Sequence, residues 1–346
     1  MKKVAVVILN YNGKGMLETF LPTLFANTDP EIADIVVADN ASTDDSVAFM
    51  QAYYPFIRLI VNPFNGGFAT GYNLAFKKIE AKYYVLLNSD IEVTPDWLLP
   101  IVELMDSDDE IAACQPKIRS YYEKEKFEYA GASGGFIDKF GYPFCRGRLF
   151  QNIEVDNGQY DAVSEVFWAT GACLIVRADV YRQFGGLDDS FFAHMEEIDF
   201  CWRIKNHGYK VYCCPQSVVF HIGGGTLPKK SPRKTFLNFR NNLSLLLKNL
   251  PQGTVFVVLV YRLFLDWIAA IKFMVDGSFA DFWAVIRAHF AFFARIPSLV
   301  KVRKTLKHGK VGEIYRHNIV FDNYLRGVKM FSQLNPSAFS TSEKKD

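Results

Sequence analysis

The stretch Tyr83-Tyr84-Val85-Leu86-Leu87-Asn88-Ser89-Asp90 passes from five apolar or aromatic residues directly into a short polar tip that ends in a carboxylate. An apolar run of this length is typical of a buried strand. In an open α/β sheet, ligands bind beyond the carboxyl ends of the strands. A carboxylate placed there can hold a divalent metal, and the metal can hold a diphosphate. The alternative is that residues 88–90 only form a turn or cap the next helix.

Strand and helix patterns alternate around this stretch. Apolar runs typical of strands occur at residues 4–9, 35–38, 58–61 and 83–87, and helical spacing follows them at residues 17–25, 43–54, 68–79 and 95–105. This alternation predicts a mixed α/β fold, with a mostly parallel sheet and helices on both of its faces. The polar loops that follow the strands should then gather along one edge of the sheet.

Beyond residue 111 the predicted strands are shorter and the turns are richer in glycine. We expect strands at residues 172–176, 211–214 and 218–221, and helices at residues 178–184 and 198–206. A segment with two prolines and two lysines follows at residues 227–232, and strongly apolar helical patterns come after it. The pattern therefore divides the chain near residue 225.

Charge is distributed unevenly, although the net charge is only +2. Residues 1–225 hold 19 basic and 30 acidic residues, whereas residues 226–346 hold 20 basic and 7 acidic ones. A basic half suggests an anionic partner, either nucleic acid or a membrane surface. Because this half is also rich in Phe, Leu, Val and Ile, it favours the membrane surface.

The basic half contains two apolar helix patterns. In the first, residues 254–275, the charges fall in one stripe about 120° wide, formed by Arg262, Asp266, Lys272 and Asp276. These charges make it a poor spanning helix, so we expect it to lie in the headgroup layer of a membrane. The second, residues 279–293, precedes cations that could bind anionic lipid, namely Lys301, Arg303, Lys304, Lys307 and Lys310. The alternative is a helical hairpin packed on the rest of the chain or on a second subunit.

The six cysteines show no CxxC spacing, which argues against a zinc site and against a disulfide framework. Buried, reduced thiols in a cytosolic protein are the expected outcome. The start, Met1-Lys2-Lys3-Val4, leads directly into the first strand pattern, which is too short for the apolar region of a signal peptide. These features predict a cytoplasmic protein that is peripheral at the inner face of the cell membrane.

Several polar groups follow the predicted strands. Asp39 ends the second strand, where it could accept hydrogen bonds from a base or a ribose, or could cap the next helix. Gly66 and Gly67, after Asn65, would let a ligand approach the backbone closely. His221 ends a later strand and could bind a metal if Asp90 lies near it.

An acidic group, Glu196-Glu197-Ile198-Asp199, opens a predicted helix. The helix dipole offsets part of the repulsion among its three carboxylates. Crowding raises the pKa of one of them, which suits a general base. The alternative is an ordinary acidic first turn.

Taken together, these motifs resemble those of glycosyltransferase family 2, the inverting nucleotide-sugar transferases of the GT-A fold. The resemblance is closest to rhamnosyltransferase-like and galactofuranosyltransferase-like members and runs from about Val4 to Gly225. Residues 88–90 match the family's D-x-D position, and residues 196–199 match its E-D motif. The other matching segments, in the family's order, are residues 6–12, 36–44, 65–73 and 168–171, and His221.

The resemblance implies a GT-A catalytic domain over residues 1–225. Its nucleotide-sugar half would span about residues 1–110 and its acceptor half about residues 111–225. A helical, basic region that associates with the membrane would follow at residues 226–346.

The resemblance also implies a role for individual residues. Glu197 is the implied catalytic base, grouped with Glu196 and Asp199, and Asp90 and His221 are the implied ligands of Mg²⁺ or Mn²⁺. The residues implied to contact the donor sugar or the acceptor are Trp168, Thr170, Gly171 and Arg203. Those implied to bind the nucleotide are Asn10, Tyr11, Asn12, Asp39, Asn65, Gly67, Asn73, Asn88 and Ser89.

The implied reaction is an in-line displacement that moves a sugar from a UDP- or dTDP-sugar to a hydroxyl of a glycan acceptor, with inversion, in cell-surface polysaccharide synthesis. The membrane-facing half suggests that the acceptor is linked to a lipid. Two residues depart from the family pattern: Asn88 replaces the first Asp of D-x-D, and Glu197 replaces the usual Asp.

Two other functions stay open at this point. The chain could be a catalytically degenerate nucleotide-sugar-binding or scaffold protein on the same fold, because half of D-x-D is lost. A nucleotidyltransferase is disfavoured, because no basic, glycine-rich triphosphate loop occurs near the N-terminus. Nucleic acid is not an expected partner, and a homo-oligomer remains open.

Overall fold

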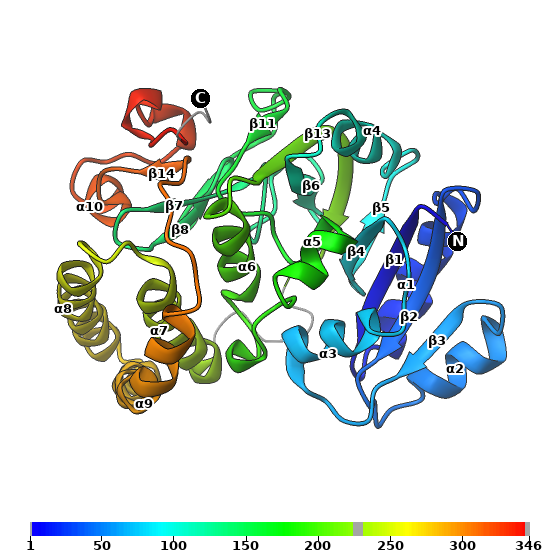
Figure 1. The fold of residues 1–346 in the computed structure, drawn as a ribbon, viewed down its shortest axis with the longest axis horizontal. Helices are drawn as coiled ribbons and strands as arrows, with labels where there is room; N and C mark the ends of the chain where they lie inside the picture. Colours follow the sequence, from blue (N-terminus) through cyan, green and yellow to red (C-terminus); the bar gives the residue numbers. More distant parts are fainter. Residues whose placement is uncertain (1, 224–230, 343–346) are drawn as a thin grey trace.

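A nine-stranded central sheet organises the molecule (Figure 1). The computed structural model describes residues 2–223 and 231–342, so most of the predicted linker at residues 227–232 lies outside the described residues. The strand order is β11-β13-β6-β12-β4-β1-β2-β3, and β5 pairs with β13. The parallel pairing of the first four strands confirms the predicted sheet; these are β1 (Val4–Asn10), β2 (Ala33–Asp39), β3 (Arg58–Val61) and β4 (Tyr83–Asn88).

The other half of the sheet contains the antiparallel pairs. β12 (Cys173–Arg177) lies antiparallel between β4 and β6 (Ile111–Ser120). β13 (Lys210–His221) runs parallel to β6 and pairs with β5 (Ile91–Val93) and β11 (Ser164–Glu165). The two strands predicted at residues 211–214 and 218–221 are therefore one strand. A register shift between them bulges the chain without ending the pairing.

Helices cover both faces of the central sheet, as predicted. On β1, Val4, Val6 and Ile8 belong to one core and Ala5 and Val7 to another, because successive side chains point to opposite faces of a strand. The core that contains Val4 also receives side chains from α1 (Lys14–Ala26), α2 (Ser46–Tyr53) and α4 (Leu99–Ser107). The other core receives side chains from α3 (Gly67–Phe76), α5 (Ala178–Gln183) and α6 (Glu196–Lys205).

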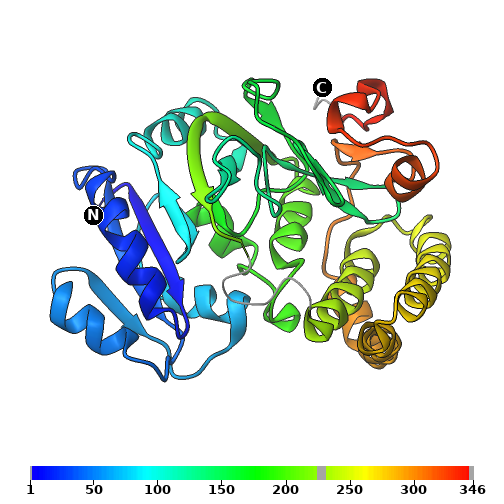
Figure 2. The same ribbon diagram turned by 180° about the vertical axis from the view of Figure 1, so that it is seen from behind.

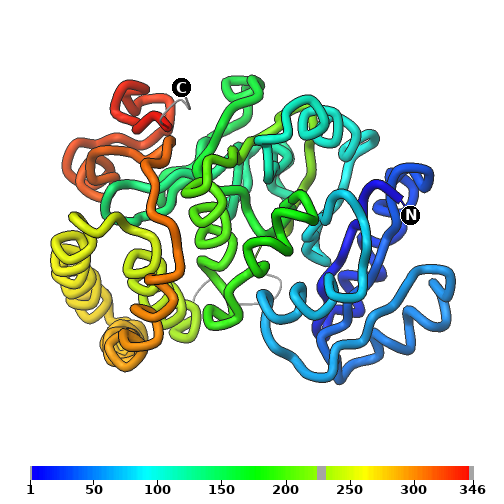
Figure 3. The backbone as a smooth tube through the Cα atoms, in the orientation of Figure 1, coloured from blue at the N-terminus to red at the C-terminus, as the bar shows by residue number. Residues whose placement is uncertain are grey.

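A second, five-stranded sheet joins the two parts of the chain. Its strands are β10 (Asn152–Ile153), β9 (Arg148–Leu149), β8 (Pro143–Cys145), β7 (Gly135–Asp138) and β14 (Ile314–Tyr315), in that order. β14 pairs in parallel with β7, and the chain reaches it by an extended path that leaves the last long helix (Figure 3). This pairing joins the chain after residue 231 to the sheet of residues 135–153, and the predicted boundary near residue 225 stays a prediction.

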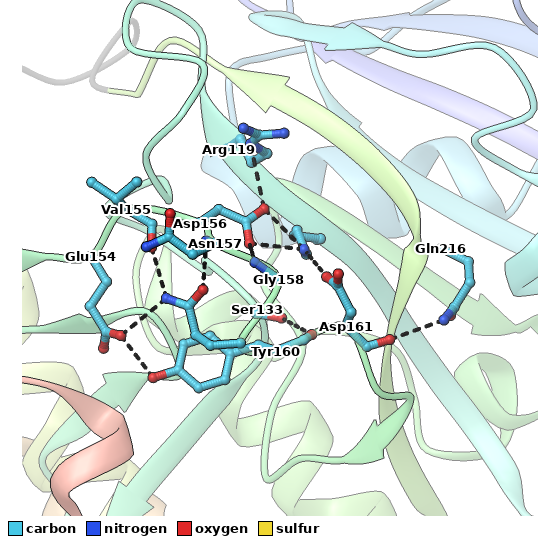
Figure 4. Close-up of polar contacts among 12 residues, drawn as sticks. Arg119, Ser133, Glu154, Val155, Asp156, Asn157, Gly158, Tyr160, Asp161 and Gln216 are labelled. Atoms are coloured by element: carbon cyan, nitrogen blue, oxygen red, sulfur yellow. Dashed lines mark hydrogen bonds and ion pairs between the residues drawn. The ribbon is translucent and has the colours of Figure 1, made fainter.

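A buried charged cluster fastens the loop at residues 154–161 to the central sheet (Figure 4). Nζ of Lys117, on β6, lies 2.9 Å from Asp156 and also pairs with Asp161, while Arg119 lies 3.6 Å from Asp156. The hydroxyl of Tyr160 donates to Glu154 at 2.8 Å. Because these side chains pair with one another, the cluster connects the loop to β6 and leaves no open site.

The chain after residue 231 forms three long helices at the end of the molecule opposite β1–β3 (Figure 2). α7 (Pro232–Asn249) packs against both α8 (Val255–Val275) and α9 (Phe279–Arg303). α9 continues past the predicted end at residue 293. After β14 come α10 (Ile319–Tyr324) and two short 3-10 helices, η2 (Phe331–Gln333) and η3 (Pro336–Ala338). A further 3-10 helix, η1 (Asp189–Phe191), precedes α6.

The charged stripe of α8 points partly into the protein. Arg262 and Asp266 are buried, pair with each other at 2.9 Å, and contact Asn242 of α7 and His289 of α9. Lys272 and Asp276 pair with each other in solvent. The hairpin thus packs on the rest of the chain through its charges. In the described parts of the chain, no helix combines the length and the apolarity needed to cross a bilayer.

Candidate functional site

The loops after β1, β2 and β4 meet at one edge of the sheet, where the strand order 3-2-1-4 changes direction. Asn10 and Asp39 are paired in register at the ends of β1 and β2. Both are buried, and the amide of Asn10 donates to Asp39 at 2.9 Å. Asp39 also accepts from the backbone N–H and the hydroxyl of Ser42, at 2.8 and 2.6 Å. Oδ1 of Asn10 is buried and has no hydrogen-bond partner among the described residues.

The two loops beside this pair are shaped by side-chain turns. Asn12 has a φ of 50° and accepts from the backbone N–H of Thr43 at 2.7 Å, while Tyr11 next to it is 40% exposed. Asn65 accepts from the N–H of Gly67 at 3.0 Å. Gly67 has a φ of +79°, and a Cβ there would lie 2.5 Å from the carbonyl oxygen of Phe192. Glycine is therefore required where the loop after β3 meets the loop before α6.

Asn73 has a structural role. Its amide nitrogen donates to the Leu187 carbonyl and to Asp189, and its oxygen accepts from Tyr181 and from the N–H of Leu187. An amide has two donors and two acceptor positions, so its capacity is used within the protein. It fastens α3 to the segment before η1 and does not offer a free contact to a nucleotide.

The predicted metal ligands lie together, because β5 and the end of β13 pair beside the tip of β4. Nε2 of His221 is 3.1 Å from Oδ1 of Asp90 and 3.5 Å from the amide nitrogen of Asn88. Glu128, from the loop between β6 and β7, lies 3.5 Å from Nδ1 of the same ring. Burial alone lowers the pKa of His221, but its contacts with Asp90 and Glu128 outweigh burial and raise this pKa to about 10.

This donor set fits a cation that takes most of its ligands from a substrate. Across residues 2–223 and 231–342, no three His, Cys, Asp or Glu side chains are arranged to hold a metal by themselves. Mg²⁺ is commonly bound by one or two carboxylates together with phosphate oxygens and water. Asp90 supplies one such carboxylate. His221 could join it only after losing its proton, because a protonated imidazole is not a ligand.

The acidic group at the start of α6 is presented by a strained loop. Phe192, His194 and Met195 have φ values of 68°, 69° and 77°, a region that side chains other than glycine rarely adopt. Such conformations cost of order 1–3 kcal/mol each and persist where the surroundings impose them. Here α7 imposes them. The amide nitrogen of Asn241, which has two hydrogens to donate, lies 2.8–3.0 Å from the carbonyl oxygens of Phe191, Ala193 and His194.

Glu196 and Glu197 each keep one carboxylate oxygen without a partner in the described structure. Burial raises the pKa of Glu197, and burial together with the charge of Glu197 raises that of Glu196. Nε2 of His194 is also without a described partner, and burial and the charge of Lys234 lower the His194 pKa to about 4. The loop thus presents buried polar atoms whose hydrogen-bonding capacity is not used.

Asp199 differs from its two neighbours. It pairs with Arg203 at 2.8 Å and with Lys248 at 2.8 Å, and it accepts from Asn249. Burial raises the pKa of Asp199, but the charges of Lys248 and Arg203 outweigh this and lower it. Arg203 also donates to the carbonyls of Phe184 and Gly186. Both side chains therefore hold α6 in place, and neither is free to contact a diphosphate or an acceptor.

The segment at residues 168–171 connects the two clusters. The ring of Trp168 is buried, donates to the Phe136 carbonyl at 2.9 Å and packs on Gly135, so it belongs to the core rather than facing a sugar. Thr170 is buried and bonded to Gln115 and Ala130. A Cβ on Gly171 would lie 3.8 Å from Cβ of Glu197, so Gly171 adjoins the acidic group.

One backbone hydrogen bond brings the metal ligands and the acidic group to the same edge. The N–H of Asn88 donates to the carbonyl of Ala172 at 2.9 Å, and Ala172 follows Gly171. The tip of β4 therefore lies beside Ala172, the neighbour of Gly171, which adjoins Glu197. Analysis of the sequence missed Glu128, Lys248 and Asn241; of these, only the Asn241-Asn242 pair carries a signal, since asparagine is a poor helix former.

Comparisons with known proteins agree with this geometry. The model of the family described as "Glycosyl transferase family 2" matches residues 5–164. The N-acetylglucosaminyl-diphospho-decaprenol L-rhamnosyltransferase of Mycobacterium tuberculosis (strain CDC 1551 / Oshkosh) is 25% identical over 231 residues, which cover 62% of this chain and 75% of that protein. Rhamnosyltransferase WbbL of Escherichia coli (strain K12) is 25% identical over 226 residues, covering 63% of this chain and 83% of WbbL.

A solved structure supports the fold. The crystal structure of GalNAc-T7 with UDP, GalNAc and Mn²⁺ superposes with a TM-score of 0.56 at 15% sequence identity. The match covers 73% of this chain and 49% of GalNAc-T7. At this identity the likeness establishes a shared GT-A architecture and nothing about substrates.

Proposed function

We propose that this chain is a glycosyl transferase of family 2 that moves a sugar from a UDP- or dTDP-sugar to a hydroxyl of a lipid-linked glycan in cell-surface polysaccharide synthesis, inverting the anomeric configuration. The observation that carries the proposal is the free, buried carboxylate oxygen of Glu197 beside Gly171, at the edge where Asp90 lies. The names of the mycobacterial and E. coli relatives support a deoxyhexose such as rhamnose as the sugar.

In the proposed reaction, Glu197 accepts the proton of the acceptor hydroxyl at its free oxygen. The acceptor oxygen then forms a bond to the anomeric carbon as the bond from that carbon to the diphosphate breaks, and the nucleoside diphosphate leaves. A raised pKa suits this role, since a stronger base removes the proton more readily. Asp199 and Arg203 act as positioning residues for α6.

Asp90 and His221 would hold Mg²⁺ or Mn²⁺, and Asn88 would contact the nucleotide. When bound, such a cation supplies positive charge that offsets the charge developing on the leaving diphosphate. Asn10 and Asp39 would contact the nucleoside, together with the exposed ring of Tyr11 and the backbone around Asn12, Asn65 and Gly67. Ser89 would sit at the diphosphate.

The outer face of α8 and α9 supports a peripheral place on the inner, anionic face of the cell membrane. Arg262 and Asp266 of α8 point into the protein, so apolar side chains on the other side of this helix point outward. α9 also exposes apolar side chains. The largest exposed apolar side chains of this face are Phe256, Val257, Phe264, Val275, Phe279, Trp283 and Phe290. Lys301, Lys304 and Lys307 are exposed at the end of α9 and after it, whereas Arg303 is buried and donates to the Leu247 carbonyl.

Binding of UDP, dTDP and GDP, with and without Mn²⁺, would test the proposal by calorimetry on the wild type and on Asp90→Ala. We expect one nucleotide to bind only with metal and to lose this binding in Asp90→Ala. The second candidate, a degenerate binding or scaffold protein, is favoured by Asn88 at the D-x-D position. It predicts nucleotide binding without turnover in the wild type, whereas the transferase predicts turnover that Glu197→Gln abolishes.

A further inference from the structure

An arginine-lined cavity of about 520 Å³ lies between α7, α9 and the strained loop before α6. Arg233 and Arg240 come from α7, Arg287 comes from α9, and Phe192 and Phe236 form apolar walls. None of these residues is among those proposed to bind the nucleotide sugar. The cavity is large enough to hold a small ligand rather than a single ion.

Each of the three guanidinium groups lies over an aromatic ring, and that of Arg240 also donates to Oδ1 of Asn241 at 2.9 Å and to the Phe191 carbonyl at 3.0 Å. Arg240 and Arg287 lie 5.2 and 5.5 Å from the centre of the Phe236 ring, and Arg233 lies 5.1 Å from that of Phe192. Among residues 2–223 and 231–342, no carboxylate lies within ion-pair distance of any of the three. Asp281, near the cavity, is bonded to the hydroxyls of Thr235 and Ser278. Burial and the charge of Arg295 lower the pKa of Arg240 to about 10, as expected for crowded cations.

Phe192 connects this cavity to the proposed catalytic edge. One side of its ring carries Arg233, and the other packs on Gly67, where an added Cβ would lie 2.7 Å from the ring. Its carbonyl accepts from the N–H of Phe68 at the start of α3. Glu196 and Glu197 follow within the same loop and helix start. A ligand in the cavity would therefore contact Phe192, which belongs to the same loop that leads into the acidic group.

The opposite wall of the cavity belongs to the exposed apolar face. Ala280, Ala284 and Arg287 line the cavity from α9, while Phe279, Trp283 and Phe290 on the same helix are exposed. Figures 1 and 2 place α9 beside α7 and α8 at that end of the molecule. A molecule with an anionic head and an apolar chain could thus fill the cavity with its head and lay its chain on α9.

We propose that this cavity binds the diphosphate of a lipid-linked acceptor, with Arg233, Arg240 and Arg287 as its cationic ligands. The inference rests on the proposed function and gives the acceptor a chemical class, an isoprenyl diphosphate-linked glycan. Arginine suits this task because its planar donors match phosphate oxygens. The diphosphate of the donor nucleotide is the other source of the same chemistry, and the test distinguishes the two.

The probe is farnesyl diphosphate, titrated calorimetrically into the full chain with saturating UDP and Mn²⁺, so that the donor position is filled. Arg233→Gln and Arg287→Gln alter exposed side chains and should fold. Each should weaken farnesyl diphosphate binding about tenfold, as expected for one lost charged hydrogen bond. Lys272→Gln, which removes one exposed charge on α8, should not. Farnesol should bind all variants equally.

Two results would overturn the inference. One is unchanged farnesyl diphosphate affinity in both arginine variants. The other is a parallel loss of UDP affinity, which would assign the cavity to the donor. If the wild type bound neither UDP, dTDP nor GDP, the proposed function would fail, but the same titration run without nucleotide would still report on the cavity.

Discussion

The ammonium of Lys248 on α7 lies 2.8 Å from Oδ1 of Asp199 on α6, and both side chains are buried. Lys248 also pairs with Asp188. The helix that follows the proposed catalytic region is thereby tied to the helix that presents Glu196 and Glu197. Breaking a buried pair leaves a charge without compensation, which costs more than the pair itself contributes.

Replacing Lys248 with Met should lower the free energy of unfolding by about 3 kcal/mol, because Asp188 and Asp199 lose a buried partner. Urea unfolding followed by circular dichroism would measure this. Lys272→Met, which breaks the exposed pair with Asp276, is the matched control and should change stability little. Equal effects from the two variants would mean that the α6–α7 connection does not depend on this charge.

Stability should fall in acid through Asp188, whose partner Lys248 holds its pKa at about 2 although burial opposes this. The ordinary value is 3.8. A carboxylate whose pKa is lower in the folded state than in the unfolded state stabilises the fold fully above the unfolded-state pKa. This contribution is lost as the pH falls to the folded-state pKa. About 2 kcal/mol should therefore disappear between pH 4 and pH 2. Between pH 4 and pH 2, the free energy of unfolding should change less with pH in Lys248→Met than in the wild type.

Replacing Glu197 with Gln should reduce turnover by about 10²- to 10⁴-fold, the range for loss of a general base. Nucleotide affinity should be unchanged, because the side chain lies on the acceptor side. In the wild type, kcat/KM should rise with pH through a pKa above the ordinary 4.5, since burial raises the pKa of Glu197. An acid limb at or below 4.5, or a fully active Gln variant, would remove Glu197 from the role of base.

Asn241→Ala should lower kcat while leaving the KM for the donor nearly unchanged. Its amide nitrogen lies within hydrogen-bond distance of the carbonyls of Phe191, Ala193 and His194, and among the described side chains only Arg240 offers another donor, to the Phe191 carbonyl. Leaving buried carbonyls unpaired should also cost about 1–3 kcal/mol of stability. Asn238→Ala on the same helix is the control. Equal kinetics for both variants would show that the loop holds its shape without α7.

The apolar face of α8 and α9 should bind vesicles that contain phosphatidylglycerol, and less so at high salt. Phe256→Ser combined with Phe264→Ser should weaken binding at least about tenfold, because each exposed ring would otherwise be buried in lipid. Tyr53→Ser on α2 removes an equally exposed ring from the far end of the molecule and should have no effect. Co-sedimentation measures both. Undiminished binding by the double variant would assign this face to another partner, such as a second copy.

The sequence by itself determined the parallel strands, their polar ends and the acidic start of α6. These features depend on local patterns: apolar runs set the strands, and parallel strands must end at one edge of the sheet. Asp90 and His221 lie 3.1 Å apart although 131 positions separate them, because β5 pairs with the end of β13 beside the tip of β4.

Only the tertiary structure decided which polar groups remain free. Asp199, Arg203 and Asn73 carry suitable chemistry, but Lys248, Asn249 and backbone carbonyls from distant segments occupy their hydrogen-bonding positions. The resemblance implies that Trp168 contacts the donor sugar or the acceptor, but the fold places Gly135 against its ring. The charged stripe of α8 was visible in sequence, but its inward direction was not. A residue's type follows from the chain, whereas the use of its charge and hydrogen bonds depends on long-range packing.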